Sequence, residues 1–219
     1  MANRSTSGFG LRMAMRLGNT PAIGGQSKYA IKSGLGVGIL KNNPASIQLA
    51  GDTGYIQDSG FSTTDDGNDG GIDFTSANDA LLVGVHNGVF FIDGTTSKPT
   101  FANSVAASAT FGTNPNTGST NGVAFVNDDP MQEYIVKTDA ACGQALFGLN
   151  GNMNDFSAGD AKDGQSTSTF DTGTQAVTAM FKIVRSAEDP DNEDLTAAGA
   201  NIVVVMNSAA NHYINGRDA

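Results

Sequence analysis

Short apolar runs separated by polar, glycine-rich steps follow one another along most of the chain. Runs that alternate apolar and polar positions, or that are apolar throughout and bounded by turn residues, predict β-strands. We expect strands within residues 28–32, 37–40, 81–85, 88–93, 123–126, 133–139, 180–185 and 202–206, with a further short strand near Phe101 and Val105. The apolar run at 202–206 is typical of a strand that is buried on both faces.

Turn residues set the connections between these strands. The stretch SIQLAGDTGYIQD (46–58) predicts a hairpin that turns at residues 51–52. The tripeptide His-Asn-Gly at 86–88 predicts a second hairpin, because Asn and Gly tolerate the positive φ of tight turns. One long bent strand over 81–93 is the alternative.

Two stretches rich in glycine and aspartate, 57–79 and 152–175, predict long loops, the second anchored by Phe156 and Phe170. Residues 140–151 alone show helical spacing, for at most two turns. About ten short strands joined by such turns predict an all-β fold, either a β-barrel or a β-sandwich. We expect a single β-rich domain over 28–219.

The charged residues divide the chain at residue 52. Residues 1–51 contain six basic residues and no acidic one, whereas residues 52–219 contain six basic residues and all 22 acidic ones. The net charge of −10 is therefore the sum of a basic leading part and an acidic body. Two interpretations stay open: the basic part packs on its own acidic body, or it binds an acidic surface outside the fold.

Residues 1–27 are expected to form an extended basic arm. Apolar residues at 11, 13, 15 and 17 alternate with arginines, as on the two faces of a strand that could add to the sheet edge of a neighbour. The candidate partner-binding residues are Arg4, Arg12, Arg16, Lys28 and Lys32. A protein surface is the expected partner, and nucleic acid is not, because phosphate would repel the acidic body.

Nothing in the sequence selects a catalytic centre. His86, His212 and Cys142 supply a base and a thiol, but each stands in a context that is more often structural. No phosphate-binding, dinucleotide-binding, serine-hydrolase or zinc-protease motif is present. We therefore expect no enzyme activity, no catalytic residues and no cofactor.

The acidic runs DDGNDGGID (65–73) and EDPDNED (188–194) raise the question of a calcium site. An EF-hand loop ends in a bidentate glutamate at its twelfth position, and here Ser76 or Ala200 stands there. Solvated acidic turns are the expected structure, with an irregular calcium site as the alternative. We expect no metal site.

The sequence indicates neither membrane insertion nor secretion. No apolar run is long enough to span a membrane, and the first residues lack the apolar stretch of a secretory signal. The single Cys142 cannot form an internal disulfide, which is typical of synthesis in a reducing cytoplasm.

Three stretches of the sequence resemble a known group of proteins. GVHNGVFFIDGTTSKPTFAN (84–103), NGVAFVNDDPMQEYIVKTDA (121–140) and the ending MFKIVRSAEDPDNEDL…NIVVVMN are similar to virion structural proteins of tailed bacteriophages, and the opening GFGLRMAMRLGN resembles marine phage and cyanophage versions. The resemblance spans most of residues 8–212 and consists of the pattern of strands and turns.

This pattern is similar to that of capsid decoration, or cement, proteins. The resemblance implies a β-tulip-like fold, a place on the capsid exterior of the virion, the major capsid protein as partner, a homotrimer, synthesis in the host cytoplasm and no catalytic residues. A tail or fibre component of the virion is the alternative. Two other classes stay open: a calcium-dependent or carbohydrate-binding module that uses the acidic loops, and a hydrolase.

Overall fold

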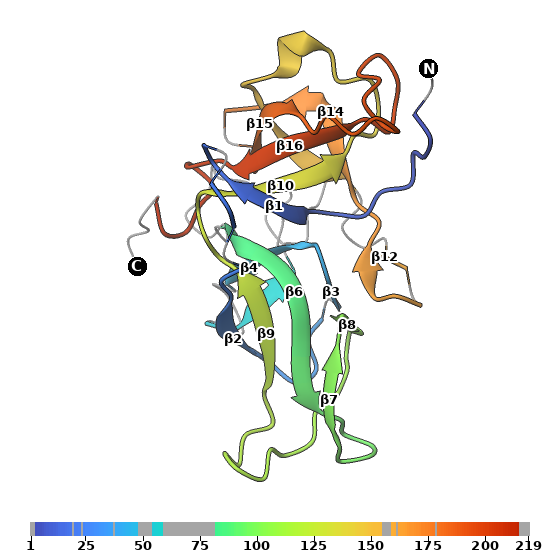
Figure 1. Cartoon of the computed structure of the whole chain (residues 1–219). Coiled ribbons are helices and arrows are strands. Elements are labelled where there is room, and N and C mark those ends of the chain that lie inside the picture. Colours follow the sequence, from blue (N-terminus) through green and yellow to red (C-terminus); the bar gives the residue numbers. More distant parts are fainter. Residues whose placement is uncertain are drawn as a thin grey trace.

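The computed structural model describes residues 3–18, 20–22, 24–36, 38–47, 54–58, 82–154, 159–160, 162–177 and 179–214. These residues form an all-β protein of several antiparallel sheets, as the sequence predicts (Figure 1). They include no α-helix; the segment with helical spacing contains one 3-10 turn, Gln144–Leu146. Most of the loop expected at 57–79 lies outside the described residues.

The upper sheet in Figure 1 has six strands in the order β1-β10-β16-β15-β11-β14. Every neighbouring pair is antiparallel. The strands are β1 (Arg12–Arg16), β10 (Gln132–Lys137), β16 (Asn201–Met206), β15 (Phe181–Ser186), β11 (Asn150–Asn154) and β14 (Thr169–Gln175). All residues of β16 are buried, which confirms the prediction for the run at 202–206.

The lower sheet has the order β2-β9-β6-β4-β5, with β7 paired to β6. Its strands are β2 (Ser27–Ile31), β9 (Gly122–Asn127), β6 (Leu82–Ile92), β4 (Pro44–Ile47), β5 (Ile56–Asp58) and β7 (Pro99–Ala102). The sheet curls until β2 contacts β5, but the described strands do not close into a barrel. Two small pairs complete the fold: β3 (Ile39–Leu40) with β8 (Ser104–Val105), and β12 (Gly159–Asp160) with β13 (Gln165–Ser166).

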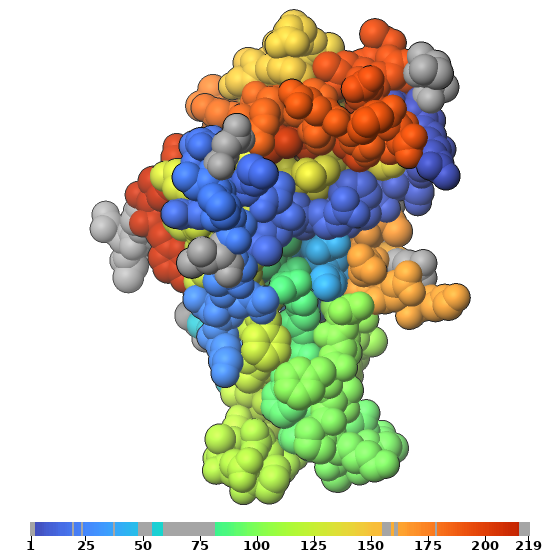
Figure 2. Space-filling view, viewed as in Figure 1, coloured from blue at the N-terminus to red at the C-terminus, as the bar shows by residue number. Residues whose placement is uncertain are grey.

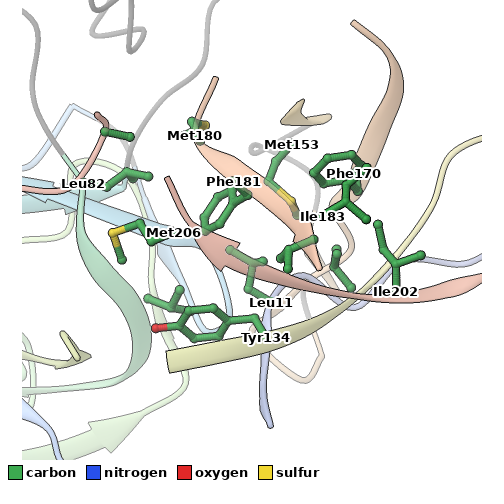
Figure 3. Packing of buried hydrophobic residues seen from close by; sticks show 14 of the residues in the cluster. Leu11, Leu82, Tyr134, Met153, Phe170, Met180, Phe181, Ile183, Ile202 and Met206 are labelled. Atoms are coloured by element: carbon green, nitrogen blue, oxygen red, sulfur yellow. The ribbon is translucent and has the colours of Figure 1, made fainter. Parts of the chain in front are cut away.

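Each sheet has its own hydrophobic core. In the upper core, side chains from β10, β11, β14, β15 and β16 converge with Leu11, which precedes β1 (Figure 3), and the largest fully buried members are aromatic. These are Tyr134, Phe170 and Phe181. The lower core is made mostly of smaller aliphatic residues, such as Ile31, Val89 and Ala124, together with Phe111.

Strand β6 joins the two halves of the molecule. Its first part contributes Leu82 and Val85 to the upper core, and Val89 further along belongs to the lower core. The hairpin expected at residues 86–88 does not form, and the alternative of one long strand is confirmed. A register shift against β9 between His86 and Gly88 absorbs the turn-like residues, because a bulge can bend a strand without ending it.

The prediction of a loop over residues 152–175 is largely wrong. Strand β14 runs through its second half, and Phe170 is a fully buried residue of that strand. The sequence conceals this strand because β14 is an edge strand whose remaining residues are mostly polar, so that only its buried positions reach the core. Phe156 lies outside the described residues.

The segment expected as an arm contributes a strand to the body of its own chain. Strand β1 pairs with β10, with Arg12 opposite Ile135 and Arg16 opposite Gln132. Within the alternation that suggested a strand, Leu11 is buried in the upper core, whereas Met13, Met15 and Leu17 remain largely exposed. Strand β1, which lies within the residues expected as an arm, therefore belongs to the same sheet as strands of the expected domain 28–219.

The close approach of β6 to the end of β9 requires a residue without a side chain at position 84. A Cβ atom on Gly84 would overlap the backbone carbonyl of Asn127. We expect Gly84→Ala to lower the free energy of unfolding by about 2 kcal/mol or more, because the backbone of β9 has to shift. Urea denaturation measures the effect. The control is Gly25→Ala, where a Cβ meets nothing, and equal stability of both variants would contradict this packing.

Candidate functional site

The structure places three of the predicted partner-binding residues against their own chain. The Arg4 guanidinium lies 2.9 Å from the Asp191 carboxylate, and that of Arg16 lies 2.5 Å from Asp129. Arg12 lies over the ring of Phe9, 4.8 Å from its centroid. Arg4 and Arg16 therefore pair with the acidic body within the same molecule, as the first interpretation of the charge pattern expects.

The other two predicted residues belong to the lower sheet. Lys28 is an exposed residue of β2, and Lys32, half-buried, follows the end of that strand. The register places Lys28 directly opposite Phe125 of β9. Lys28 therefore borders a surface whose residues are far apart in the sequence.

The outward side of the lower sheet carries aromatic residues on three neighbouring strands. Phe90 of β6 stands opposite Val123 of β9 on one side and opposite Phe101 of β7 on the other. Their neighbours in sequence, such as Val89 and Ala124, point inward and form the lower core. We call this outward side the aromatic face; it consists of Lys28, Ala30, Phe90, Phe101, Val123 and Phe125.

The three rings form a continuous ridge. The centroids of Phe90 and Phe101 are 4.6 Å apart, and those of Phe101 and Phe125 are 6.4 Å apart. The Phe101 side chain is 74% exposed, although the burial of a phenylalanine side chain away from water normally lowers the free energy of a protein. In Figure 2 the strands that carry these residues lie side by side on the narrow lower part of the molecule. Phe90 and Phe125 are half-buried, so that Phe101 is the exposed part of the ridge. An exposed aromatic ring on such a ridge is typical of a binding surface.

The electrostatic character of this face differs from that of the whole chain. None of the strands β2, β6, β7 and β9 contains an acidic residue, although the chain has 22 of them and a net charge of −10. The only charged member of the aromatic face is the cation Lys28. The face is therefore suited to apolar contact with a partner that presents carboxylates nearby.

A second polar cluster lies in the interior, where the two sheets meet. His86 Nε2 is 3.0 Å from Asp58 Oδ1 and 3.2 Å from the carbonyl oxygen of Gln57. Asp58 Oδ2 accepts hydrogen bonds from Asn43 Nδ2 at 2.9 Å and from the backbone N–H of Leu40 at 3.2 Å. The side chains of His86 and Asp58 are 0% and 3% exposed.

This network continues into the upper half of the molecule. Ser168 Oγ donates to Asn43 Oδ1 at 3.4 Å, and Ser166 Oγ donates to Ser168 Oγ at 2.8 Å. The sequence of serine, histidine and aspartate is superficially that of a nucleophilic site. Because these groups are buried and hydrogen-bonded to one another, a substrate has no access to them, and the network serves to hold segments together.

The remaining chemical candidates are also accounted for by local structure. Asp189 accepts hydrogen bonds from Asn192, from Asn201 and from the backbone N–H of Asp191, and these bonds lower its pKa. Among the described residues no group of three or more His, Cys, Asp or Glu could hold a metal ion. The acidic run at 65–73 lies outside the described residues.

The comparisons with known proteins identify no relative: no family model, curated protein or solved structure matches the chain. Within the described part of the chain, no helix has the length and apolar character needed to cross a membrane.

Cys142 is fully buried in the upper core, and burial, with a contribution from Asp139, raises the pKa of its thiol to about 11. At pH 8 the thiol of the folded chain is then neutral, and the reactive thiolate is scarce. We expect the folded protein to react with Ellman's reagent roughly a hundredfold more slowly at pH 8 than the urea-unfolded chain. Comparable rates would show that Cys142 is accessible and activated.

Removing the Asp58 carboxylate leaves the buried donors of Asn43 and Leu40 without their acceptor and removes the charged neighbour of His86. We expect Asp58→Ala to lower the free energy of unfolding by about 3 kcal/mol or more. Chemical denaturation measures the loss, and Asp163→Ala, at an exposed position, should change stability by about 0.5 kcal/mol or less. A similar small effect for Asp58→Ala would refute the role of the network.

Proposed function

We propose that this chain is a capsid decoration protein of a tailed bacteriophage, which binds the outer shell between capsomers and stabilises the head. The observation that carries the proposal is the aromatic face: a ridge of three phenylalanines beside Lys28, with Phe101 exposed between the half-buried Phe90 and Phe125, on strands without acidic residues. The resemblance of 84–103 and 121–140 to virion structural proteins covers the strands β6, β7 and β9 that build this face.

The partner surface is the major capsid protein. A shell surface that is apolar and bears carboxylates complements both the phenylalanine ridge and the cation at its border. The acidic remainder of the chain keeps the exposed side of the attached protein soluble. Single-stranded nucleic acid would also stack on aromatic rings, but a net charge of −10 opposes its approach.

Attachment to a repeating shell multiplies a modest contact. Each copy buries one aromatic face, and copies that are joined to one another bind their next shell site as an intramolecular event. We propose a homotrimer at local threefold positions of the capsid exterior, since closed rings are the usual form of such assemblies. The task requires a rigid surface and no catalytic group.

The test is binding of the purified chain to heads of the phage that encodes it, from which the native decoration protein has been removed. We expect Phe101→Ala to weaken binding at least about tenfold, because a central aromatic residue of an interface is worth about 2 kcal/mol. Co-sedimentation of the chain with heads measures the affinity. The matched control is Val177→Ala, which alters a residue that is 85% exposed and lies outside the aromatic face.

Two results would overturn the proposal. Binding to heads that Phe101→Ala leaves unchanged would remove the aromatic face from the contact. Association of the chain with purified tails and not with heads would assign it to the tail or fibre, which is the alternative place for such a protein in the virion.

A further inference from the structure

The N-terminal segment, residues 3–9, is held by an acidic loop of the same chain. It runs beside the loop of residues 187–201 at the upper right of Figure 1, and both appear together on the surface in Figure 2. The backbone N–H of Arg4 donates to the carbonyl oxygen of Asp191 at 3.0 Å, and the Arg4 side chain donates to the Asp191 carboxylate at 2.9 Å. This pair is the centre of the contact.

The neighbouring residues extend the same contact on both sides. The Asn3 amide donates to the carbonyl oxygen of Ala198 at 2.9 Å and accepts from the backbone N–H of Asp194 at 3.0 Å. Lys137 Nζ donates to the carbonyl oxygen of Ser5 at 2.7 Å. The loop thus binds the segment as it would bind a peptide, through backbone groups and short polar side chains.

The binding surface of the loop is organised independently of the segment. Asp189 accepts hydrogen bonds from Asn192 and Asn201, and Asp194 accepts from the hydroxyl and the backbone N–H of Thr196. These bonds lie within the loop or join it to β16. The loop therefore keeps its shape when residues 3–7 leave it.

The first residues of the segment have little besides this loop that fixes them to their own body. Residues 3–7 carry no apolar side chain, and the Arg4–Asp191 pair is exposed on both sides, so that it contributes only weakly. The firm anchor begins at Phe9, whose carbonyl oxygen accepts from Asn42 Nδ2 at 3.0 Å and whose ring lies under Arg12, and it continues at Leu11, which is fully buried. Residues 3–7 can leave the loop without disturbing β1 or the core.

We infer that the loop 187–201 is a receptor for residues 3–7 of a second copy of this chain, so that copies exchange the first residues of their N-terminal segments. An identical neighbour offers every contact made within one chain, and exchange therefore replaces equivalent bonds and costs mainly entropy. Where copies are crowded, that entropic cost falls and the exchanged segments link neighbours. The inference does not depend on which surface binds a shell, and its failure would leave the proposed function intact.

Full-length variants with one introduced cysteine test the exchange directly. Arg4→Cys marks the segment and Asp191→Cys marks the receptor, so a disulfide between the two variants forms only when one chain's segment occupies the other's loop. Cys142 is buried and does not interfere. At a total concentration of about 1 mM, near the effective concentration of a short tether, we expect at least about tenfold more cross-linked heterodimer than from a mixture of Arg4→Cys and Val177→Cys.

A chain that carries both Arg4→Cys and Asp191→Cys shows that the disulfide forms within one molecule. If it forms there and the mixed single variants give no more heterodimer than the Val177→Cys control, the inference is wrong.

Charge reversal gives a second readout that requires no disulfide. In a mixture of Arg4→Glu and Asp191→Arg chains, each segment is repelled by its own loop and attracted by that of the other chain. We expect roughly two- to fivefold more dimer than for the unaltered chain by analytical ultracentrifugation, as the strength of an exposed ion pair allows. A dimer content equal to that of the unaltered chain would also overturn the inference.

Discussion

The buried Asp58 carboxylate is the constraint on which the arrangement of the two sheets depends. It lies at the end of β5 and contacts Asn43 and His86, and the backbone N–H of His86 donates in addition to the carbonyl oxygen of Asn43. From the same short segment, the carbonyl oxygen of Asn42 accepts from the backbone N–H of Leu11. A buried carboxylate is costly unless its oxygens are satisfied, so these elements are compelled to meet in one geometry. The junction is thereby fixed by polar groups, with a separate apolar core on either side.

This junction explains why β6 is continuous. The residues that would form a turn in isolation, at 86–88, include the buried histidine of the network, and a bulge keeps the strand running past it. Because β6 then extends from the upper core to the aromatic face, Phe90 is held on a strand that is anchored at its other end. A ridge on such a strand is preorganised, and less conformational entropy is lost when a partner covers it.

The sequence was sufficient where burial and turn chemistry agree. The run 202–206 and the 46–58 hairpin, in which Ile47 pairs with Ile56, were predicted because apolar alternation and turn residues give the same answer. It failed at β14, whose exposed positions look like a loop, and at His86, whose role depends on an aspartate 28 positions away. The aromatic face was missed for a related reason: Phe90, Phe101 and Phe125 become neighbours only through the pairing of three strands.

The division of charge at residue 52 has a more specific meaning in the folded chain than in the sequence. Arg4 and Arg16 of the basic part are paired with aspartates of the acidic part, so these cations are largely committed within the molecule. Lys28 differs because the strand paired with β2 contains no acidic residue, and its exposed side chain lies opposite Phe125. At the aromatic face, apolar contact and Coulomb attraction can therefore act on the same surface of a partner. The same separation leaves the paired arginines to hold the chain, or copies of it, together.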